Sequence, residues 1–365
     1  MLITANETFL ANNWSDISQL SLFHGIKNLQ ILLYLLISVI GTTGNILVCR
    51  AIMRCSTKKT NELFILNLAI TDISTSLLSV PLDLAELIKG HFPFGSVFCN
   101  LVYPFQTLLM IVSVMTLLFM SVERYRAIAT PLKRRIPSNA AKVSILISWL
   151  FAVACVAPYA TVLDFKDKAC IEVWRHDSHR KVFTLTIFML FYLVPLSVIS
   201  ICYIRTMVIL FKTLRNVQKL LGAKNMKTWN LGKRRARQNL RTVKIFVIAV
   251  VAFACCLLPT HVLWLWHDFG NGRNFKHFGI VIAFSNIMIY SNSVINPFIF
   301  GKINLTTCLK SIGTSKITSS FRNSGFVLRT REISFRNSFR SSTKVREIQE
   351  KSDWQYQYIV YVTSV

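Results

Sequence analysis

Residues 101–125 read LVYPFQTLLMIVSVMTLLFMSVERY, and this stretch decides the fold of the chain. Its first 22 residues contain no Lys, Arg, Asp or Glu. About 20 helical residues are enough to cross the ~30 Å hydrocarbon core of a membrane. A soluble helix would carry a face of charged residues with a period of 3.6, and this stretch carries none. It therefore predicts a membrane-spanning helix that ends at an acid–base pair, Glu123 and Arg124.

Six further stretches have the same character and predict an all-α membrane protein, a seven-transmembrane helix bundle. The whole chain is 53% hydrophobic and 16% charged, which is too apolar for a soluble surface. Only the second span contains a Lys, Arg, Asp or Glu, the carboxylate of Asp72. The seven predicted spans are Leu29–Cys49, Leu63–Leu82, Leu101–Val122, Val143–Leu163, Val182–Ile204, Ile245–His267 and His277–Gly301.

The net charge of +26 is distributed unevenly along the chain. Nine Lys and Arg residues fall in the N-terminal segment and the second, fourth and sixth connections, and the other 33 fall on the opposite side. Because basic loops stay in the cytoplasm, this predicts a multi-pass plasma-membrane protein with an extracellular N-terminus. The basic segments flank spans and lack a nucleic-acid motif. We therefore expect them to attract anionic membrane lipid and not nucleic acid.

Four segments follow from this topology. Residues 1–28 form an extracellular segment that is glycosylated at Asn6 and Asn13, each the first residue of an Asn-X-Ser/Thr tripeptide. Residues 29–301 form the bundle. Residues 302–312 are predicted to form a short amphipathic eighth helix on the membrane surface, and residues 313–365 a disordered cytoplasmic tail.

The last two segments carry candidate modification and docking residues. Cys308 lies beside the surface helix and is a candidate palmitoylation site. The serines and threonines of the tail could accept phosphates for arrestin binding. The chain ends in Thr363, Ser364 and Val365, a pattern that suits a PDZ domain, although short endings also match by chance.

Asp72 is costly inside a membrane and so marks a functional hypothesis. Polar residues lie near mid-depth on other spans and could surround a cation such as sodium, which takes oxygen ligands. They are Asn45, Ser113, Asn292 and Ser293. The alternative is a protonated Asp72 held by hydrogen bonds. Nine cysteines without CxxC spacing indicate no zinc site.

A set of motifs in order along the spans resembles the rhodopsin-like (class A) G-protein-coupled receptors. The resemblance covers residue 29 to about residue 310. The matching residues are Gly44-Asn45, Leu68-Ala69-Ile70-Thr71-Asp72, Cys99, Glu123-Arg124-Tyr125, Pro131, Trp149, Pro158, Cys170, Pro195, Tyr203, Phe253, Cys256, Pro259 and Asn296-Pro297-Phe298-Ile299-Phe300.

This resemblance implies roles for individual residues. It implies a disulfide between Cys99 and Cys170, and an Arg124 that Glu123 holds at rest and that meets a heterotrimeric G protein on activation. It implies an allosteric sodium site at Asp72, Ser113, Asn292 and Ser293, and no other cofactor. The remaining switch residues that it implies are Tyr125, Tyr203, Phe253, Pro259, Asn296, Pro297 and Phe300.

Three residues depart from the family pattern. Leu257 stands where the family usually has tryptophan, Phe300 where it has tyrosine, and Asn239 where many members have an acid that locks the arginine. Leu257 and Phe300 put the usual switch contacts in doubt. Asn239 indicates a loosely held resting state and hence basal signalling.

The outer half of the bundle predicts the ligand class. Tyr290 stands where a retinal-binding lysine would be, and Gln106 where an amine-binding aspartate would be. Gln106 at that position resembles the neuropeptide receptors, so we expect a peptide ligand. Four carboxylates at the outer ends of the spans would suit a basic or amidated end of that peptide, and they are Asp83, Glu86, Glu172 and Asp268. A lipid or another small non-amine ligand is the alternative. The candidate ligand-binding residues are Asp83, Glu86, Gln106, Glu172, His261, Trp264, Asp268, Asn286 and Tyr290.

Two other classes of membrane protein fit the sequence less well. An enzyme would need a converging catalytic set, whereas the seven histidines lie toward the outer side without metal spacing, so we assign no catalytic residue. A transporter would usually show internal repeats with broken helices, and neither half of the chain echoes the other. The carboxylates could also be ordinary loop ends paired with Lys89, Arg175 or Arg273.

Overall fold

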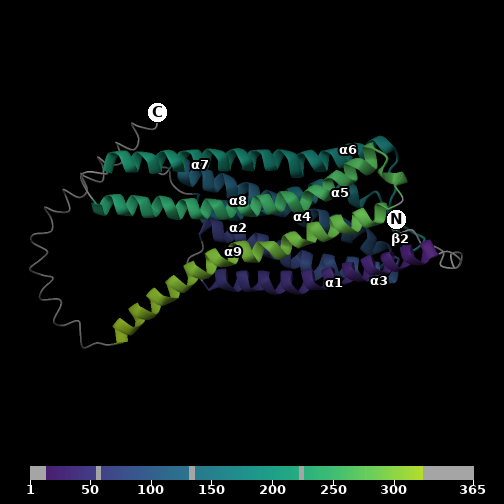
Figure 1. Ribbon diagram of the computed structural model, residues 1–365, viewed down its shortest axis with the longest axis horizontal. Helices are drawn as coiled ribbons and strands as arrows, with labels where there is room; N and C mark the ends of the chain where they lie inside the picture. The colour runs from purple at the N-terminus through teal and green to yellow at the C-terminus, as the bar shows by residue number, and fades with distance from the viewer. Residues whose placement is uncertain (1–13, 55–58, 131–135, 222–225, 276, 324–365) are drawn as a thin grey trace, which may run out of the picture. The chain divides into compact units, whose positions relative to one another are not determined.

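The computed structural model describes residues 14–54, 59–130, 136–221, 226–275 and 277–323. Within these residues, seven helical stretches are long and apolar enough to cross a membrane. They pack as a bundle of long, roughly parallel helices (Figure 1). This confirms the predicted seven-helix fold. The seven stretches are His24–Met53, Thr60–Lys89, Gly95–Ala129, Ser138–Ala160, Asp177–Thr213, Ala236–Phe269 and Phe278–Phe300.

Five of these stretches are uninterrupted α-helical segments, and the second and fifth each contain one π-helical turn. The π turns leave one additional residue in a helical turn and are frequent at functional sites. The elements are α1 (Trp14–Met53), α2 (Thr60–Ser74), η1 (Thr75–Ser79, π), α3 (Val80–Lys89), α4 (Gly95–Ala129), α5 (Ser138–Ala160), β1 (Leu163–Lys166), β2 (Ala169–Glu172), α6 (Asp177–Phe188), η2 (Met189–Leu193, π), α7 (Val194–Leu221), α8 (Met226–Phe269), η3 (Gly272–Asn274, 3-10) and α9 (Phe278–Asn323).

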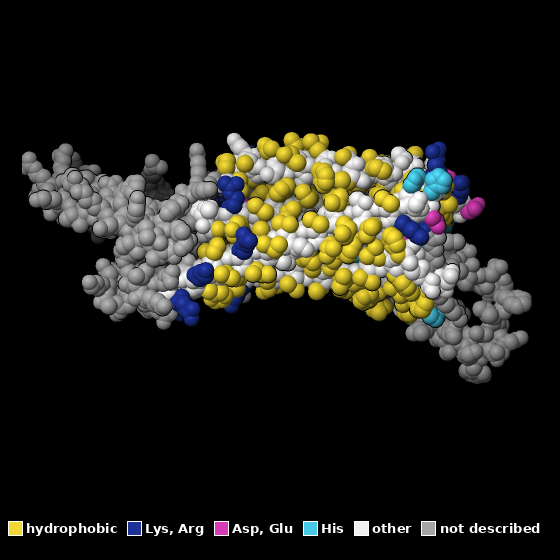
Figure 2. All heavy atoms as spheres, turned by 90° about the horizontal axis from the view of Figure 1, so that it is seen from above, with side chains coloured by type: hydrophobic (Ala, Val, Ile, Leu, Met, Phe, Trp, Pro, Cys, Tyr) yellow, Lys and Arg dark blue, Asp and Glu magenta, His cyan; other side chains and the backbone are white. Residues whose placement is uncertain are grey.

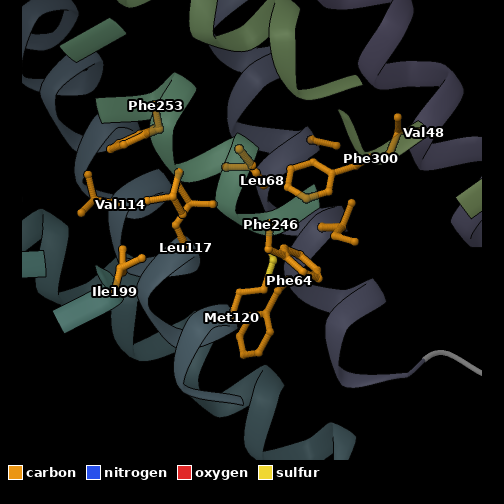
Figure 3. Packing of buried hydrophobic residues seen from close by; sticks show 14 of the residues in the cluster. Val48, Phe64, Leu68, Val114, Leu117, Met120, Ile199, Phe246, Phe253 and Phe300 are labelled. Atoms are coloured by element: carbon orange, nitrogen blue, oxygen red, sulfur yellow. The ribbon is translucent and has the colours of Figure 1, made fainter. Parts of the chain in front are cut away.

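The principal core lies where α1, α2, α4, α7, α8 and α9 converge (Figure 3). It contains large side chains that are fully buried, such as Met120 on α4, Phe246 on α8 and Phe300 on α9. Other apolar side chains face outward and form a broad hydrophobic surface between the ends of the bundle (Figure 2). Leu47 and Phe298 are examples. Such a surface suits lipid and would be unfavourable in water.

A short hairpin covers one end of the bundle. Strands β1 and β2 are antiparallel, with Leu163 opposite Glu172 and Lys166 opposite Ala169. The two turn residues between them, Asp167 and Lys168, both have positive φ, as the tight turns that match strand twist require. The backbone N–H of Phe92 donates to the carbonyl of Lys168 over 2.8 Å. The hairpin is therefore held by backbone contacts as well as by its own pairing.

A disulfide joins Cys99 at the start of α4 to Cys170 on β2. The predicted bond is thus present. It closes a loop with a sequence separation of 71 residues, and a cross-link of this length stabilises a fold mainly by restricting the unfolded chain. The disulfide fixes the hairpin over the outer ends of the helices that line the site described below.

All seven helical stretches differ in their bounds from the predicted spans, and two of the differences bear on a predicted element. The fourth span was predicted to reach Leu163, but α5 ends at Ala160 and Leu163 opens β1. The backbone of α9 is helical to Asn323, so the surface helix predicted at 302–312 forms part of that helix and the helical backbone continues beyond it. Its location on a membrane surface stays a prediction. Asn6, Asn13, Thr363 and Val365 lie outside the described residues, and for Cys308 only the backbone is described.

Candidate functional site

Asp83 on α3 lies at the centre of a polar network in the half of the bundle that carries the hairpin. Gln106 Nε2 on α4 donates to its Oδ1 over 2.7 Å, and the hydroxyl of Tyr290 on α9 donates to its Oδ2. The ring of Tyr290 meets that of Tyr34 on α1 edge to face, with centroids 5.7 Å apart. Three helices thus meet at one carboxylate, and α1 joins them through the ring contact. Asn286, one turn before Tyr290, hydrogen-bonds Tyr34 and belongs to the same network.

Two further carboxylates at this end are also bound by neutral donors. The hydroxyl of Tyr103 donates to Glu86 Oε2 over 2.8 Å. Glu172 on β2 accepts from the Tyr159 hydroxyl over 3.1 Å and from Trp174 Nε1 over 2.8 Å. Among the described side chains, no Lys, Arg or His forms a salt bridge with Asp83, Glu86 or Glu172. Their negative charge is therefore solvated or hydrogen-bonded but not neutralised by a neighbouring cation.

Asp268 is the exception among the four predicted ligand carboxylates. Its side chain is only 1% exposed, and Arg180 Nε on α6 lies 3.1 Å from its Oδ1. Thr184 donates to Oδ2 over 2.6 Å, and His267 Nδ1 lies 2.8 Å from Oδ1. The structure thus places Asp268 in a buried ion pair that connects α6 to α8. Its basic partner is thus Arg180, and not one of the loop residues that the sequence suggested, which were Lys89, Arg175 and Arg273.

The other predicted ligand residues occupy different environments. His261 is buried, with its ring centroid 4.8 Å from that of Tyr192, and its Nε2 has no hydrogen-bond partner. Trp264 is exposed, and its ring meets that of His267 with centroids 5.5 Å apart. Asp83, Gln106, Asn286 and Tyr290 are brought together by hydrogen bonds and one ring contact, whereas no contact joins Trp264 to that network.

The hairpin carries one further ion pair. Lys166 Nζ lies 2.8 Å from Asp164 Oδ2. The hydrogen bond from this lysine lowers the pKa of the Asp164 carboxyl, and the carboxylate in turn raises the pKa of Lys166. Both groups are exposed, so the pair contributes little to stability.

Asp72 is buried at mid-span. Asn296 Nδ2 donates to its Oδ2 over 2.9 Å, and Ser293 also hydrogen-bonds it. Ser113 instead donates to the hydroxyl of Thr71 over 2.9 Å. The Oδ1 atom of Asn292 is buried without a hydrogen-bond partner. One carboxylate with neutral oxygens nearby suits a sodium ion, and the unpartnered Asn292 oxygen fits that donor set.

The described residues contain no group of three or more His, Cys, Asp or Glu that could hold a transition metal or zinc. Any cation at Asp72 would therefore depend on neutral hydroxyl and amide oxygens, which are the ligands of hard ions.

Arg124 lies at the other end of the bundle among three kinds of contact. Its Nε is 3.7 Å from Glu123 Oε2, and its guanidinium carbon is 5.0 Å from the centroid of the Phe246 ring on α8. With the amide of Asn61 turned toward Glu123, its nitrogen donates to Glu123 Oε2 over 2.6 Å and its oxygen accepts from Arg124 Nε over 2.9 Å. The ring of Phe246 contacts that of Phe300 on α9, with centroids 5.7 Å apart.

The remaining predicted switch residues are packed nearby. Tyr203 on α7 and Phe253 on α8 are buried in the principal core, and Tyr125 is half-buried. Pro259 and Pro297 lie inside α8 and α9, where each removes a backbone hydrogen bond. A Cβ at Gly44 would lie 3.0 Å from the Pro297 ring, so glycine allows α1 to approach α9 there.

The structure also describes the surroundings of the three residues that depart from the family pattern. Leu257 is fully buried in the core, Phe300 packs on Phe246, and Asn239 is exposed. Phe300 therefore makes a ring contact where a tyrosine would offer a hydroxyl.

Several residues in these networks were not identified from the sequence. Tyr103, Tyr159, Trp174 and Arg180 belong to outer contacts, and Asn61 and Phe246 to the contacts of Arg124. Aromatic residues near a membrane interface are common, so their type alone carries no functional signal. What distinguishes these aromatic residues is that a ring hydroxyl or a ring face pairs with a specific charged group. That pairing depends on the tertiary structure.

Comparisons with known proteins agree with this arrangement. Residues 44–300 match the sequence profile of the family described as 7 transmembrane receptor (rhodopsin family). The chain is 29% identical over 292 residues to the Neuropeptide FF receptor 2 of Mus musculus, covering 74% of this chain and 68% of that protein. It is 30% identical over 288 residues to the Galanin receptor type 1 of Rattus norvegicus, covering 76% and 79% of the two chains. It is 31% identical over 281 residues to the Galanin receptor 2b of Danio rerio, covering 74% and 70%.

Proposed function

The chain belongs to the rhodopsin family of seven-transmembrane receptors, and we propose that it binds an extracellular peptide and activates a heterotrimeric G protein. Members of this family are receptors and not enzymes, so the bound ligand is a signal and not a substrate. The relatives named above are receptors for neuropeptide FF and for galanin. These names support a peptide as the class of ligand for this chain, but they do not give the peptide's sequence.

One observation carries the ligand proposal: among the described residues, the donors to Asp83 are neutral groups on two other helices. Glu86, one turn away on α3, is likewise paired only with a tyrosine. Two carboxylates without a neighbouring cation favour a ligand that brings a positive charge. Asp268 already has the guanidinium of Arg180, so we assign the ligand's basic end to Asp83 and Glu86, and a structural role to Asp268.

The proposed orientation places the hairpin end of the bundle outside the cell. Disulfides persist in oxidising compartments, and the Cys99–Cys170 bond lies at that end. The start of α1 lies at the same end (Figure 1). On the face shown in Figure 2, Lys and Arg side chains lie at both ends of the hydrophobic surface, and Asp, Glu and His side chains accompany them at the hairpin end. The predicted topology assigns 33 of the 42 Lys and Arg residues to the opposite side. An extracellular N-terminus in the plasma membrane follows, with glycans proposed on Asn6 and Asn13.

The proposed mechanism is a shift between two arrangements of the helices. A ligand that binds one arrangement better than the other shifts the population toward it. In the resting arrangement Arg124 contacts Glu123, Asn61 and Phe246, which lie on α4, α2 and α8. Displacement of α8 separates Arg124 from Phe246 and opens the cytoplasmic end to the G protein. Arg124→Ala is expected to abolish nucleotide exchange by the G protein while the receptor still reaches the cell surface.

A sodium ion at Asp72 is proposed to stabilise the resting arrangement. Asp72, Ser293 and Asn292 supply oxygens near α9, and Ser113 is within the same buried region on α4. Three further proposals rest on the sequence alone. They are arrestin binding to phosphorylated tail residues, palmitoylation of Cys308, and a PDZ partner at Thr363 and Val365. Metabolic labelling with a palmitate analogue in the Cys308→Ser variant tests the second of these.

A peptide library applied to cells that express the receptor with a promiscuous G protein tests the ligand class. Calcium release is the readout, and an antibody against the receptor verifies surface expression. We expect a basic or amidated peptide to act, and its potency to fall about ten-fold or more in Asp83→Asn. Asp268→Asn is the matched control, because its carboxylate is already paired.

Two outcomes would count against this assignment. Silence across the library, with the receptor at the surface, would favour a lipid or another small ligand. A peptide whose potency is unchanged by Asp83→Asn but falls in Asp268→Asn would place the ligand's charge on the other carboxylate.

A further inference from the structure

Four side chains form a closed constellation at the outer end, beside the Asp83 network. We call it the Glu172 cluster, and it consists of Tyr159, Glu172, Trp174 and Phe183. Tyr159 and Trp174 each donate a hydrogen bond to one oxygen of Glu172, over 3.1 and 2.8 Å. The rings of Tyr159 and Trp174 both contact Phe183, each with centroids 5.4 Å apart. A carboxylate and three aromatic rings therefore share one site, drawn from α5, β2, the loop that follows β2, and α6.

The carboxylate of this cluster retains the capacity to bind a cation. A carboxylate offers about four acceptor positions, and the two neutral donors occupy one on each oxygen. Glu172 is exposed, and Trp174 and Tyr159 are half-buried, so a solute can reach them. The hydrogen bonds also hold the indole and the phenol beside the charge.

The neighbouring basic residues of the hairpin and of α6 contact groups other than Glu172. Lys166 pairs with Asp164, and Arg180 pairs with Asp177 and Asp268. Lys181 lies over the ring of Phe269, at 5.9 Å from its centroid. Within the part of the chain that the structure describes, Glu172 is thus a hairpin carboxylate that no cation neutralises.

A purely structural role would be to fix the hairpin to α5 and α6. A neutral glutamine could accept the same hydrogen bonds for that purpose, and a neighbouring arginine could pair with the glutamate, as Arg180 does with Asp268. A retained charge close to three aromatic rings instead suits a planar cation, because a guanidinium binds carboxylate oxygens through its edge and stacks on aromatic rings through its face.

We propose that the Glu172 cluster is a binding subsite for a guanidinium group, which in a peptide ligand is an arginine side chain. The inference rests on the proposed function for the identity of that ligand, but the chemistry of the subsite does not depend on it. The cluster is separate from the Asp83 network, so a ligand with two positive groups would engage both. Arginine is favoured over lysine because an ammonium has no planar face to stack.

Fluorine NMR on the purified receptor tests the subsite directly. The receptor is labelled with 5-fluorotryptophan, and the Trp174 resonance is identified by its loss in Trp174→Phe. N-acetyl-arginine amide and its neutral citrulline analogue are titrated at millimolar concentrations. We expect a saturable shift of the Trp174 resonance with the arginine probe and little response to the citrulline probe.

Variants separate recognition of charge from support of the hairpin. Glu172→Gln keeps an acceptor for the indole and should weaken the arginine response about five-fold. Asp164→Asn removes a carboxylate that is already paired on the same hairpin and should leave the response unchanged. Apparent melting temperatures of both variants show that the fold is retained.

The inference is overturned by equal responses to the arginine and citrulline probes, by no shift of the Trp174 resonance, or by an undiminished response in Glu172→Gln. The first two outcomes use the unaltered receptor and do not depend on how a variant folds. A silent peptide screen with a positive Trp174 response would overturn the peptide ligand but not the subsite. A peptide hit with no Trp174 response would overturn the subsite but not the peptide ligand.

Discussion

At the scale of single residues, Arg124 contacts an aromatic ring of the sixth span, whereas many family members pair this arginine with an acid of that span. The acid that many family members carry at the start of the sixth span is Asn239 here, and its side chain is exposed. On the same helix, two turns closer to the membrane centre, the Phe246 ring lies 5.0 Å from the guanidinium carbon of Arg124. Phe246 in turn rests on Phe300 (Figure 3). Arg124 is thus connected to α8 and α9 through two aromatic residues.

Replacing Phe246 by leucine is expected to raise basal signalling. The substitution removes a cation–π contact of about 1 kcal/mol, which would shift the ratio of active to resting receptor about five-fold. Ligand-independent nucleotide exchange on a purified G protein, normalised to receptor amount, measures the effect. Phe191→Leu is the matched control, because it shortens another fully buried phenylalanine, whose ring contacts that of Phe151 and which is not among the predicted switch residues. Equal basal rates in both variants would show that loss of core volume, and not of the ring contact, is responsible.

Asp268 poses a second question at the scale of residues, because its carboxylate is almost fully buried. Arg180→Ala removes the guanidinium and leaves that charge without its cation, which is expected to cost about 3 kcal/mol of stability. Asp268→Asn should cost less, because a neutral amide still accepts the hydrogen bond from Thr184. The apparent melting temperature in detergent measures both. A comparison with Arg175→Ala, which removes an exposed arginine in the loop just before α6, controls for the loss of surface charge. Similar melting temperatures for the Arg175 and Arg180 variants would contradict a stabilising pair.

At the scale of elements, Asp72 connects α2 to α9 through Asn296 and Ser293. If sodium binds there, wild-type receptor should melt at a higher temperature in sodium chloride than in N-methylglucamine chloride at equal ionic strength. The difference should vanish in Asp72→Asn, because the variant lacks the negative charge that offsets the desolvation of the ion. Ser74→Ala, which alters a neighbouring hydroxyl bonded to its own helix, should retain it. A sodium effect that survives in Asp72→Asn would assign the ion to another place.

The elements also show which parts of the structure could be read from the sequence. Lipid admits only uniformly apolar helices, so each span could be predicted from composition alone. The disulfide followed from the family resemblance. The hairpin could not be predicted, because Asp167 and Lys168 lack the Asn-Gly or Gly signals of tight turns. The π turns at Thr75–Ser79 and Met189–Leu193 could not be predicted either, because their amino-acid composition does not differ from that of the rest of the spans.

For the candidate site, residue types could be predicted but not their partners. Asp83, Gln106 and Tyr290 were proposed to bind ligand and do lie together. Asp268 was proposed on the same grounds, yet its charge is taken by Arg180, a residue 88 positions earlier. The difference depends on how α6 and α8 pack. A single sequence does not contain that information.

At the scale of the whole molecule, the uneven distribution of charge predicts the topology. The sequence assigns 33 of its 42 Lys and Arg residues to one side of the predicted spans, and the hairpin with its disulfide lies at the other end, where Asp and Glu side chains stand beside Lys and Arg on the face shown (Figures 1 and 2). An epitope tag placed before residue 1 is therefore expected to be stained by antibody on intact cells, and a tag after residue 365 only after permeabilisation. Reduced electrophoretic mobility that is lost in Asn6→Gln/Asn13→Gln would report glycans on the same side. Staining of the C-terminal tag on intact cells would reverse the orientation.

The π turn at Thr75–Ser79 has a consequence for how such a receptor can evolve. Because each residue of an α-helix turns the chain by about 100°, the additional residue rotates everything beyond it relative to Asp72. A one-residue deletion in this turn would swing Asp83 and Glu86 away from their present partners and leave the inner segment in phase. Insertions and deletions here can therefore rotate the half of the span that carries Asp83 and Glu86, while the half that carries Asp72 is inherited unchanged.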